Sequence, residues 1–331
     1  MKQSGNRNAT ISEIITTLLN AESVLITGHV RPDGDSVGCM IAMAQFLNNA
    51  GVKAVATSLK KGLGGPEFLT GIKKMITPKS AARKKFDLLL TVDCGSLERI
   101  PEELHKFLDP CTVINIDHHQ TNTRFGNLNL VKGTASSTGE LIWKIARKAG
   151  WQLDNISAEA LWVALITDTG RFAYDMTSSS TLRCAADLLS HNVRTAFIND
   201  QLYCSFSRTN IELKRRAYRS LKITDNNQIA AVTLTGRDFR EIGGTKADAE
   251  DIIEIPRSLL GNKVAIFFYE SEDGNETRIS LRTREPLNAT KLVEKFDGGG
   301  HPRAAGCTIK EPLGKAKRIM NQAIKRWMSE E

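Results

Sequence analysis

The spacing of hydrophobic residues predicts alternating helices and strands in the first part of the chain. Thr10 and Glu13 form a capping box ahead of the amphipathic run ISEIITTLL, which predicts a helix. The β-branched run SVLITGH then predicts a strand that ends at His29. Apolar residues at helical spacing over 36–50 stop at Gly51, and VKAVATS follows as the next strand. Together these segments predict a βαβ unit.

Two continuous apolar runs come next, FDLLLTVD ending at Asp93 and CTVINID ending at Asp117. Such runs are typical of strands that are buried on both faces of a parallel sheet. Three helices are then predicted, one capped by Ser137 and Glu140, one opened by Ser157, and one over STLRCAADLLSH. We expect these helices to cover the sheet.

A second set of elements begins near residue 223. The basic run RTNIELKRRAYRSLKI predicts a helix whose charges either line a cleft or, as is typical of a charge run, form a solvated face. The runs QIAAVTLT, KVAIFFYE and TRISLRT predict strands, and helices are predicted over 289–296 and 313–328. We therefore predict an α/β protein with three parts: a parallel-sheet N-terminal domain over 1–190, a connecting basic helical linker over 191–222, and a smaller C-terminal α/β domain over 223–331.

Composition narrows the class of protein. The chain has 331 residues, of which 41% are hydrophobic and 25% are charged, which excludes a single small module and a disordered or fibrous chain. The net charge of +8 is compatible with an anionic substrate but is only weak evidence for one. The six cysteines form no C-x-x-C pair, which argues against a zinc knuckle or a disulfide framework and favours a reducing compartment. Because the sequence has neither a signal peptide nor an apolar run of about 18 residues, we expect a cytoplasmic protein with no membrane partner.

Histidine and aspartate follow several of the predicted strands. In an open parallel sheet, ligands bind at the carboxyl ends of the strands, so these side chains should meet at one edge. A lone Asp in such a place is usually a cap or a solvated residue, but this combination favours a metal site. The candidate residues are His29, Asp33, Asp35, Asp93, Asp117, His118, His119 and, at a helix end, Asp168.

The types of these residues indicate which ions they would bind. Imidazole and carboxylate ligands without thiolates suit Mn²⁺, with Zn²⁺, Fe²⁺ and Mg²⁺ as alternatives. The supply of ligands exceeds what one ion needs, so we expect two. Two cations about 3.5 to 4 Å apart can neutralise a phosphodiester and turn a bridging water into the hydroxide nucleophile. Asp93 is the natural bridge, whereas Asp117 has a serious alternative role in orienting a neighbouring histidine.

Five motifs resemble those of a known family. HVRPDGDSVG, VDCGS, DHHQTN and TDTGRF are similar, in order, to the four motifs of the DHH phosphoesterase superfamily. GGGHPRAAG resembles the glycine-rich signature of the C-terminal domain associated with that superfamily, although alone it could equally be a turn. The compact two-domain form resembles the NrnA type of oligoribonuclease, also called nanoRNase and 3'-phosphoadenosine 5'-phosphate phosphatase. The resemblance implies an active-site cleft between the two domains.

The resemblance also implies roles for individual residues. One ion would be held by His29, Asp33 and Asp93, and the other by Asp35, Asp93, His118 and Asp168. Asp93, His118, His119 and Asp117 would be the catalytic residues. The substrate-binding residues would be Arg31, His119, Arg282, Gly298, Gly299, Gly300 and His301. The sequence departs from the family at Cys39 and Thr283, where Ser is frequent; neither change removes a metal ligand.

These roles imply a manganese-dependent hydrolase that cleaves very short RNA or dinucleotides to nucleoside monophosphates, and 3'-phosphoadenosine 5'-phosphate as a further substrate. A cyclic or linear dinucleotide phosphodiesterase is the alternative enzyme, and a catalytically silent nucleotide-binding protein with structural metal is the alternative of another class. An inorganic pyrophosphatase would have a basic C-terminal motif in place of GGGHPRAAG, and a processive exonuclease would carry an extra binding domain. The sequence leaves four points open: the polarity of cleavage, the length of the substrate, the preference for RNA or DNA, and whether the chain forms a homodimer.

Overall fold

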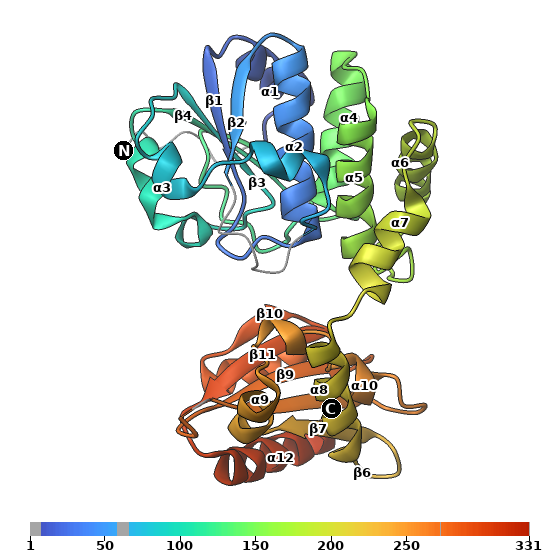
Figure 1. Ribbon diagram of the computed structural model, residues 1–331. Helices are drawn as coiled ribbons and strands as arrows, with labels where there is room; N and C mark the ends of the chain where they lie inside the picture. The colour runs from blue at the N-terminus through green and yellow to red at the C-terminus, as the bar shows by residue number, and fades with distance from the viewer. Residues whose placement is uncertain (1–7, 58–65, 272, 331) are drawn as a thin grey trace. The chain divides into compact units, whose positions relative to one another are not determined.

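The computed structural model describes residues 8–57, 66–271 and 273–330, which belong to two compact units (Figure 1). The units are Met1–Cys204 and Ser205–Glu331. The predicted linker over 191–222 spans this junction. Its basic helix, α8 (Arg208–Arg219), packs in the second unit because Leu213 and Ala217 are buried in a core there. Within the described residues, every helix is too short or too polar to cross a membrane.

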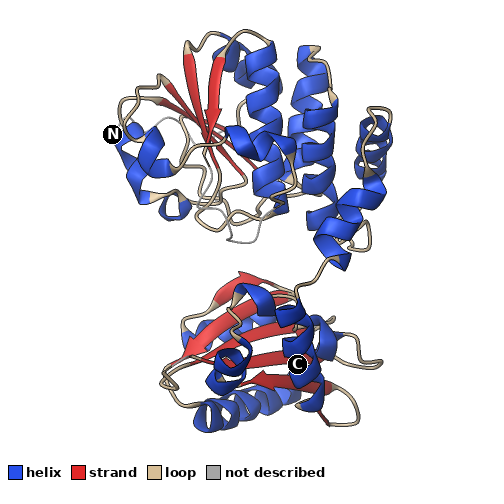
Figure 2. Cartoon of the chain, viewed as in Figure 1, coloured by secondary structure: helices blue, strands red, loops and turns tan. Residues whose placement is uncertain are grey.

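The first unit contains a parallel sheet, as predicted, with its strands drawn in red in Figure 2. It has five strands in the order β2-β1-β3-β4-β5, four of which the sequence predicts. The strands are β1 (Ser23–Thr27), β2 (Lys53–Ala56), β3 (Leu88–Val92), β4 (Thr112–Asp117) and β5 (Leu128–Val131). Strand β5 is absent from the sequence prediction. It has four residues, two of them only half-buried, so its pattern is too brief to distinguish a strand from a loop.

Helices cover both faces of this sheet. Alternate residues of each strand point to opposite faces, so that Val24 and Ile26 join the larger core while Leu25 joins the smaller one. The larger core lies against α1 (Ile11–Leu19), α2 (Gly34–Asn49), α4 (Thr138–Ala149) and α5 (Asn155–Asp168), with α6 (Ser179–Leu189) and α7 (Thr195–Asn199) outside them. The smaller core lies against α3 (Pro78–Ala81) and the 3₁₀ turn η3 (Glu102–Phe107).

The caps show why these helices begin where they do. Thr10 and Glu13 form the predicted capping box of α1, and the Ser137 hydroxyl accepts a hydrogen bond from the Glu140 backbone N–H at the start of α4. The predicted start at Ser157 is wrong by three residues. Asp154 is the N-cap of α5, and Ser157 completes that capping box from inside the helix.

The second unit contains a six-stranded mixed sheet in the order β10-β11-β9-β8-β7-β6. The strands are β6 (Lys222–Thr224), β7 (Ile229–Leu234), β8 (Val264–Glu270), β9 (Thr277–Thr283), β10 (Gly299–His301) and β11 (Ala304–Ile309). One face carries α11 (Ala289–Val293) and α12 (Leu313–Glu330). The other carries α8, α9 (Gly236–Ile242) and α10 (Glu254–Arg257). The glycine run, predicted as an anion-binding loop or a turn, forms edge strand β10.

Candidate metal centre

Three neighbouring strands end together at one edge of the parallel sheet. Thr27 of β1 pairs with Thr91 of β3, and Val92 of β3 pairs with Ile116 of β4, so the three carboxyl ends are in register. The residues that follow these ends are the ones that sequence analysis selected. They are His29 after β1, Asp93 after β3, and His118 and His119 after β4.

Two helix ends bring the remaining carboxylates to the same edge. Asp33 is the N-cap of α2 and accepts a hydrogen bond from the Ser36 backbone N–H, while Asp35 lies in the first turn of that helix. Asp168 is the last residue of α5, which packs against α2. The buried apolar faces of α2 and α5 therefore determine where these three carboxylates stand relative to the strand ends.

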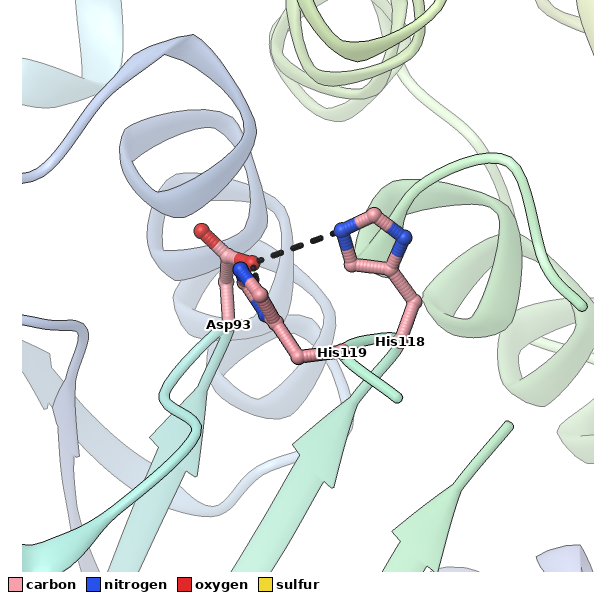
Figure 3. A group of neighbouring side chains, drawn as sticks. All are labelled: Asp93, His118 and His119. Carbon is pink, nitrogen blue, oxygen red and sulfur yellow. Dashed lines mark ion pairs between the residues drawn. The ribbon is translucent and has the colours of Figure 1, made fainter. Parts of the chain in front are cut away.

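Asp93 lies at the centre of the site and is 1% exposed. Its Oδ2 is 3.6 Å from Nε2 of His29. Its Oδ1 is 3.9 Å from Nε2 of His118 and 3.6 Å from Nδ1 of His119, and Figure 3 shows these three side chains. The backbone of Asp93 has a φ of 52°, a left-handed conformation that turns the chain sharply at the end of β3. The two carboxylate oxygens thus face different histidines, as a bridging ligand requires.

The side chains form three groups whose nitrogen and oxygen atoms lie within 4.8 Å of one another. The groups are His29 with Asp33 and Asp93; Asp35 with His118 and Asp168; and Asp93 with His118 and His119. In the second group, Nε2 of His118 is 2.9 Å from Oδ2 of Asp168 and 3.9 Å from Oδ2 of Asp35. The first group is one of the two ligand sets that the family resemblance implies, and the second contains the other set apart from Asp93, whose Oδ1 is 3.9 Å from Nε2 of His118. Each group contains an imidazole and carboxylates, a donor set that fits a divalent cation such as Mn²⁺.

The electrostatics of the site also fit a bound cation. Burial, together with the charge of neighbouring carboxylates, raises the pKa of Asp35 and of Asp93 well above the usual range. Burial lowers the pKa of His29 to about 4, which keeps that imidazole neutral at pH 7. Burial also opposes the charge on His118, but the hydrogen bond to Asp168 together with the charges of Asp35, Asp168 and Asp117 outweighs burial and raises the pKa of His118 to about 9. Cations at this edge would relieve the repulsion among the carboxylates.

Asp117 has a different position from the other carboxylates. It is fully buried, and its Oδ1 accepts hydrogen bonds from Nδ1 of His119 at 2.8 Å and from the backbone N–H of His118. Its Oδ2 accepts a hydrogen bond from the Asn122 amide at 2.5 Å. Burial works against ionisation, but the hydrogen bonds from His119 and Asn122 outweigh it and lower the pKa of Asp117. This geometry favours the orienting role over direct ligation.

Several supporting residues escaped the sequence analysis. The backbone N–H groups of Thr138 and Gly139 donate to Asp35 at 2.7 and 2.9 Å, and the Thr138 hydroxyl donates to Oδ1 of Asp93 at 3.3 Å. The two backbone donors belong to the first turn of α4, where N–H groups have no hydrogen-bond partner within the helix. The cap at Ser137 predicted the start of that helix, but not that the start faces Asp35. The Cys39 thiol, at one of the two departures from the family, also donates to Oδ1 of Asp35.

The predicted substrate-binding residues belong to both units of the chain. Arg31 is exposed beside the metal groups, whereas Arg282 lies on β9 and lines a cavity of about 360 Å³ with Phe239, Lys246, Phe267, Tyr269 and Ser280. A Cβ atom on Gly300, where φ is 144°, would stand 2.4 Å from the Ala304 carbonyl oxygen, so close strand pairing requires glycine there. Gly299 has open space around it. The side chain of His301 lies outside the described residues.

Comparison with known families assigns both units. Residues 23–166 match the N-terminal domain of the DHH family, and residues 226–330 match the DHHA1 domain. The chain contains a DHH domain and a DHHA1 domain. The metal groups described above come from the DHH domain and from the residue Asp168 just beyond the matched segment, while Arg282 and the glycine run come from the DHHA1 domain.

Curated relatives of this chain include two proteins named bifunctional oligoribonuclease and PAP phosphatase NrnA. The one from Bacillus subtilis is 25% identical over 90% of this chain and 93% of its own length. The one from Thermus thermophilus is 28% identical over 87% of this chain and 84% of its own length. An exopolyphosphatase-related protein from Bacteroides fragilis shares the fold, with a TM-score of 0.89, 23% identity and 96% coverage of both chains.

Proposed function

We propose that this chain is a metal-dependent phosphodiesterase that hydrolyses very short oligonucleotides to nucleoside monophosphates. The observation that carries the proposal is the position of Asp93 between two groups of imidazole and carboxylate ligands at one edge of the sheet. The relatives named as oligoribonuclease and PAP phosphatase support this choice of substrate. They also support 3'-phosphoadenosine 5'-phosphate as a second substrate, because both reactions hydrolyse a phosphate ester on ribose.

His29 and Asp33 would hold one ion and Asp35, His118 and Asp168 the other, with Asp93 shared between them. Bound divalent ions would supply the charge that activates water at neutral pH and neutralises the phosphate. We expect Mn²⁺ in both positions because the donors are imidazoles and carboxylates. The backbone N–H groups of Thr138 and Gly139 hold Asp35 in place for this role.

His119 would face the substrate phosphate or its leaving oxygen. Asp117 accepts a hydrogen bond from Nδ1 of His119, and Asn122 in turn donates to Asp117, so the orientation of the imidazole is fixed through Nδ1. Arg31, exposed beside the ligands, supplies a further positive charge. For the other end of the substrate we propose Arg282, the backbone of Gly298, Gly299 and Gly300, and His301.

The experiment that tests this function is turnover of a labelled dinucleotide by the full chain, with and without divalent cations. We expect nucleoside monophosphates to form with Mn²⁺, to stop forming after EDTA treatment, and to form again when Mn²⁺ is restored. The same assay with cyclic dinucleotides measures the alternative substrate class. Retained activity in fully demetallated protein would rule out the proposed chemistry, and the absence of activity with metal would support a silent binding protein.

A further inference from the structure

A groove in the second unit is lined by residues of edge strand β6, of the neighbouring strands and of helix α12. Its volume is about 370 Å³, within the range of ligand-binding pockets. Its floor contains the apolar side chains of Ile229, Ala231 and Phe268. Its walls are polar and carry four cations and one carboxylate: Lys222, Lys317, Arg318, Lys325 and Asp225.

The cations on α12 are arranged along one side of that helix. Lys317, Asn321 and Lys325 are spaced four residues apart, so they share a face, and Lys317 and Lys325 are separated by roughly 12 Å along the helix axis. Lys222 faces them from β6. A groove with positive charge on both walls over this length can contact more than one phosphate group of a single strand.

These cations lack internal counter-ions. Within the described part of the chain, Lys222, Lys317, Arg318 and Lys325 form no ion pair with a carboxylate. The basic helix α8 of the same unit is different, because its Lys214, Arg215 and Arg216 pair with Asp251, Glu212 and Asp238. The basic helix thus neutralises much of its own charge, whereas the groove keeps its charge available for an external anion.

Repulsion between lysines in the groove destabilises the folded chain, and a bound anion would offset that repulsion. Lys317 is half-buried, with Nζ 5.7 Å from the centre of the Phe268 ring. Burial, with a further contribution from the charge of Lys222, lowers the pKa of Lys317. Two like charges held near each other over an apolar floor are unfavourable for the folded chain alone. A phosphate group between them would convert that repulsion into attraction.

The groove is separate from the substrate contacts proposed above. It lies at the β6 edge of the sheet, whereas the glycine run forms β10 at the opposite edge. Phe268 faces the core beneath α12, while Arg282 pairs with Ala265, whose side chain belongs to the other core. Arg282 and the groove therefore lie on opposite faces of one sheet.

We propose that this groove binds the sugar-phosphate backbone of a short single-stranded RNA, independently of its base sequence. The only aromatic ring among the lining residues, Phe268, is 1% exposed, so it offers no stacking surface for a base. A concave basic surface suits a strand better than a flat membrane. Such a site would hold an RNA longer than the dinucleotide substrate on the enzyme without taking part in hydrolysis.

The test uses the full chain in EDTA, so that the strand is not cut, and a fluorescein-labelled oligoadenylate of about ten nucleotides. The groove variant is Lys222→Met/Lys317→Met/Lys325→Met, which removes three charges and keeps the apolar stems. The matched control is Lys53→Met/Lys148→Met/Lys310→Met, which removes three charges from positions outside the groove. Fluorescence anisotropy over a salt series measures affinity and its salt dependence.

We expect the groove variant to bind the oligoadenylate about tenfold or more weakly, with a salt slope smaller by about one for each phosphate that the variant no longer neutralises. The control should stay within about twofold of the parent. Equal affinities for the groove variant and the control would overturn the proposal. Binding to vesicles of phosphatidylglycerol, abolished in the groove variant, with no binding of oligoadenylate would also overturn it, in favour of a membrane surface.

Two further measurements separate this proposal from the proposed catalytic function and from a structural role. With Mn²⁺, the groove variant should cleave a dinucleotide at the parent rate, because the groove contains no residue placed in the active site. If neither protein cleaves it, the catalytic proposal fails while the binding result stands. The unfolding temperature of the groove variant should equal or exceed that of the control, and a lower value would overturn the proposal by showing that the lysines stabilise the fold.

Discussion

The two sheets of this chain distribute their functional side chains in different ways. In the first unit, β1, β3 and β4 run in one direction, so residues from distant parts of the sequence meet at one edge. In the second unit, β9 is antiparallel to both of its neighbours, and neighbouring strand ends lie at opposite edges. Its polar side chains, such as Arg278 and Arg282, lie along a strand instead. A parallel sheet concentrates chemistry at an edge, and a mixed sheet spreads it over a face.

The two units also treat charge differently. The first unit buries carboxylates and surrounds them with donors, as for Asp35 at the start of α4. The second unit keeps most carboxylates near the surface, and several of them pair with arginine, as in Arg215 with Glu212. A buried carboxylate loses its hydration and needs either a full set of donors or a cation, whereas a surface ion pair contributes little to stability.

The largest effect is expected for Asp93→Ala, which removes the carboxylate shared by both ligand sets. Because loss of residues that only support metal ligands costs about 10- to 100-fold, we expect kcat/KM for a dinucleotide to fall by more than about 100-fold. Circular dichroism should show an intact fold, since the sheet is held by its apolar cores. Mn²⁺ should raise the unfolding temperature of the parent but not of the variant. Activity within about tenfold of the parent in metal-saturated protein would contradict the bridging role.

Asp117→Asn tests the orienting network. The amide cannot accept from both His119 and Asn122, so the His119 imidazole should lose its fixed orientation. We expect kcat to fall by about 10- to 100-fold. Metal content, measured by elemental analysis, should stay at the parent level because Asp117 belongs to none of the ligand groups. Loss of metal from this variant would instead make Asp117 a ligand.

The variants Glu140→Gln and Glu212→Gln compare a buried carboxylate with a surface one. Glu140 is 1% exposed and accepts hydrogen bonds from Ser136 and Ser180 and from Lys144. Burial opposes its ionisation, but these donors outweigh burial and lower its pKa to about 2. Allowing for water around Lys144, we expect the variant to lose about 2 kcal/mol of unfolding free energy at pH 7. Glu212→Gln, which breaks the exposed pair with Arg215, should leave stability unchanged.

The sign of the pH dependence follows from the lowered pKa. Glu140 titrates near 4.5 when unfolded and near 2 when folded, so its contribution is complete above about 4.5 and is lost as the pH falls toward 2. Parent and Glu140→Gln should therefore converge in stability over that range, as measured by denaturant unfolding at each pH. A difference that stayed constant down to pH 2 would show that the carboxylate charge is not what stabilises α4.

The smallest effect is expected in the second unit. Arg282→Ala should raise KM for a dinucleotide by about tenfold, with kcat and metal content unchanged, because it would remove the proposed charge-assisted hydrogen bond to phosphate and changes no residue of the metal groups. Arg278→Ala is the control. It lies on the same strand but donates to the Tyr269 hydroxyl and lies outside the residues lining the cavity. Equal KM values for the two variants would remove Arg282 from the proposed substrate contacts.

Much of the first unit could be predicted from local patterns. The apolar runs before Asp93 and Asp117 are long enough to be recognised as buried strands, and the cap at Ser137 marks the start of α4 correctly. Strands β5, β6, β10 and β11 were not predicted. Strands β5, β6 and β10 have only three or four residues, and two of the three residues of β10 are glycines. Local periodicity therefore carries little information about them, and pairing with neighbouring strands is what makes them strands.

For the site, local sequence patterns are enough to select the residues proposed to carry the chemistry, because Asp and His placed directly after parallel strands come to one edge of the sheet. How these side chains meet depends on tertiary packing. Packing of α2 against α5 brings Asp168 to His118, and the position of α4 directs its free N–H groups at Asp35. The groove between β6 and α12 likewise joins residues about a hundred positions apart. Such contacts depend on how helices and sheets pack, and short-range sequence patterns do not record that packing.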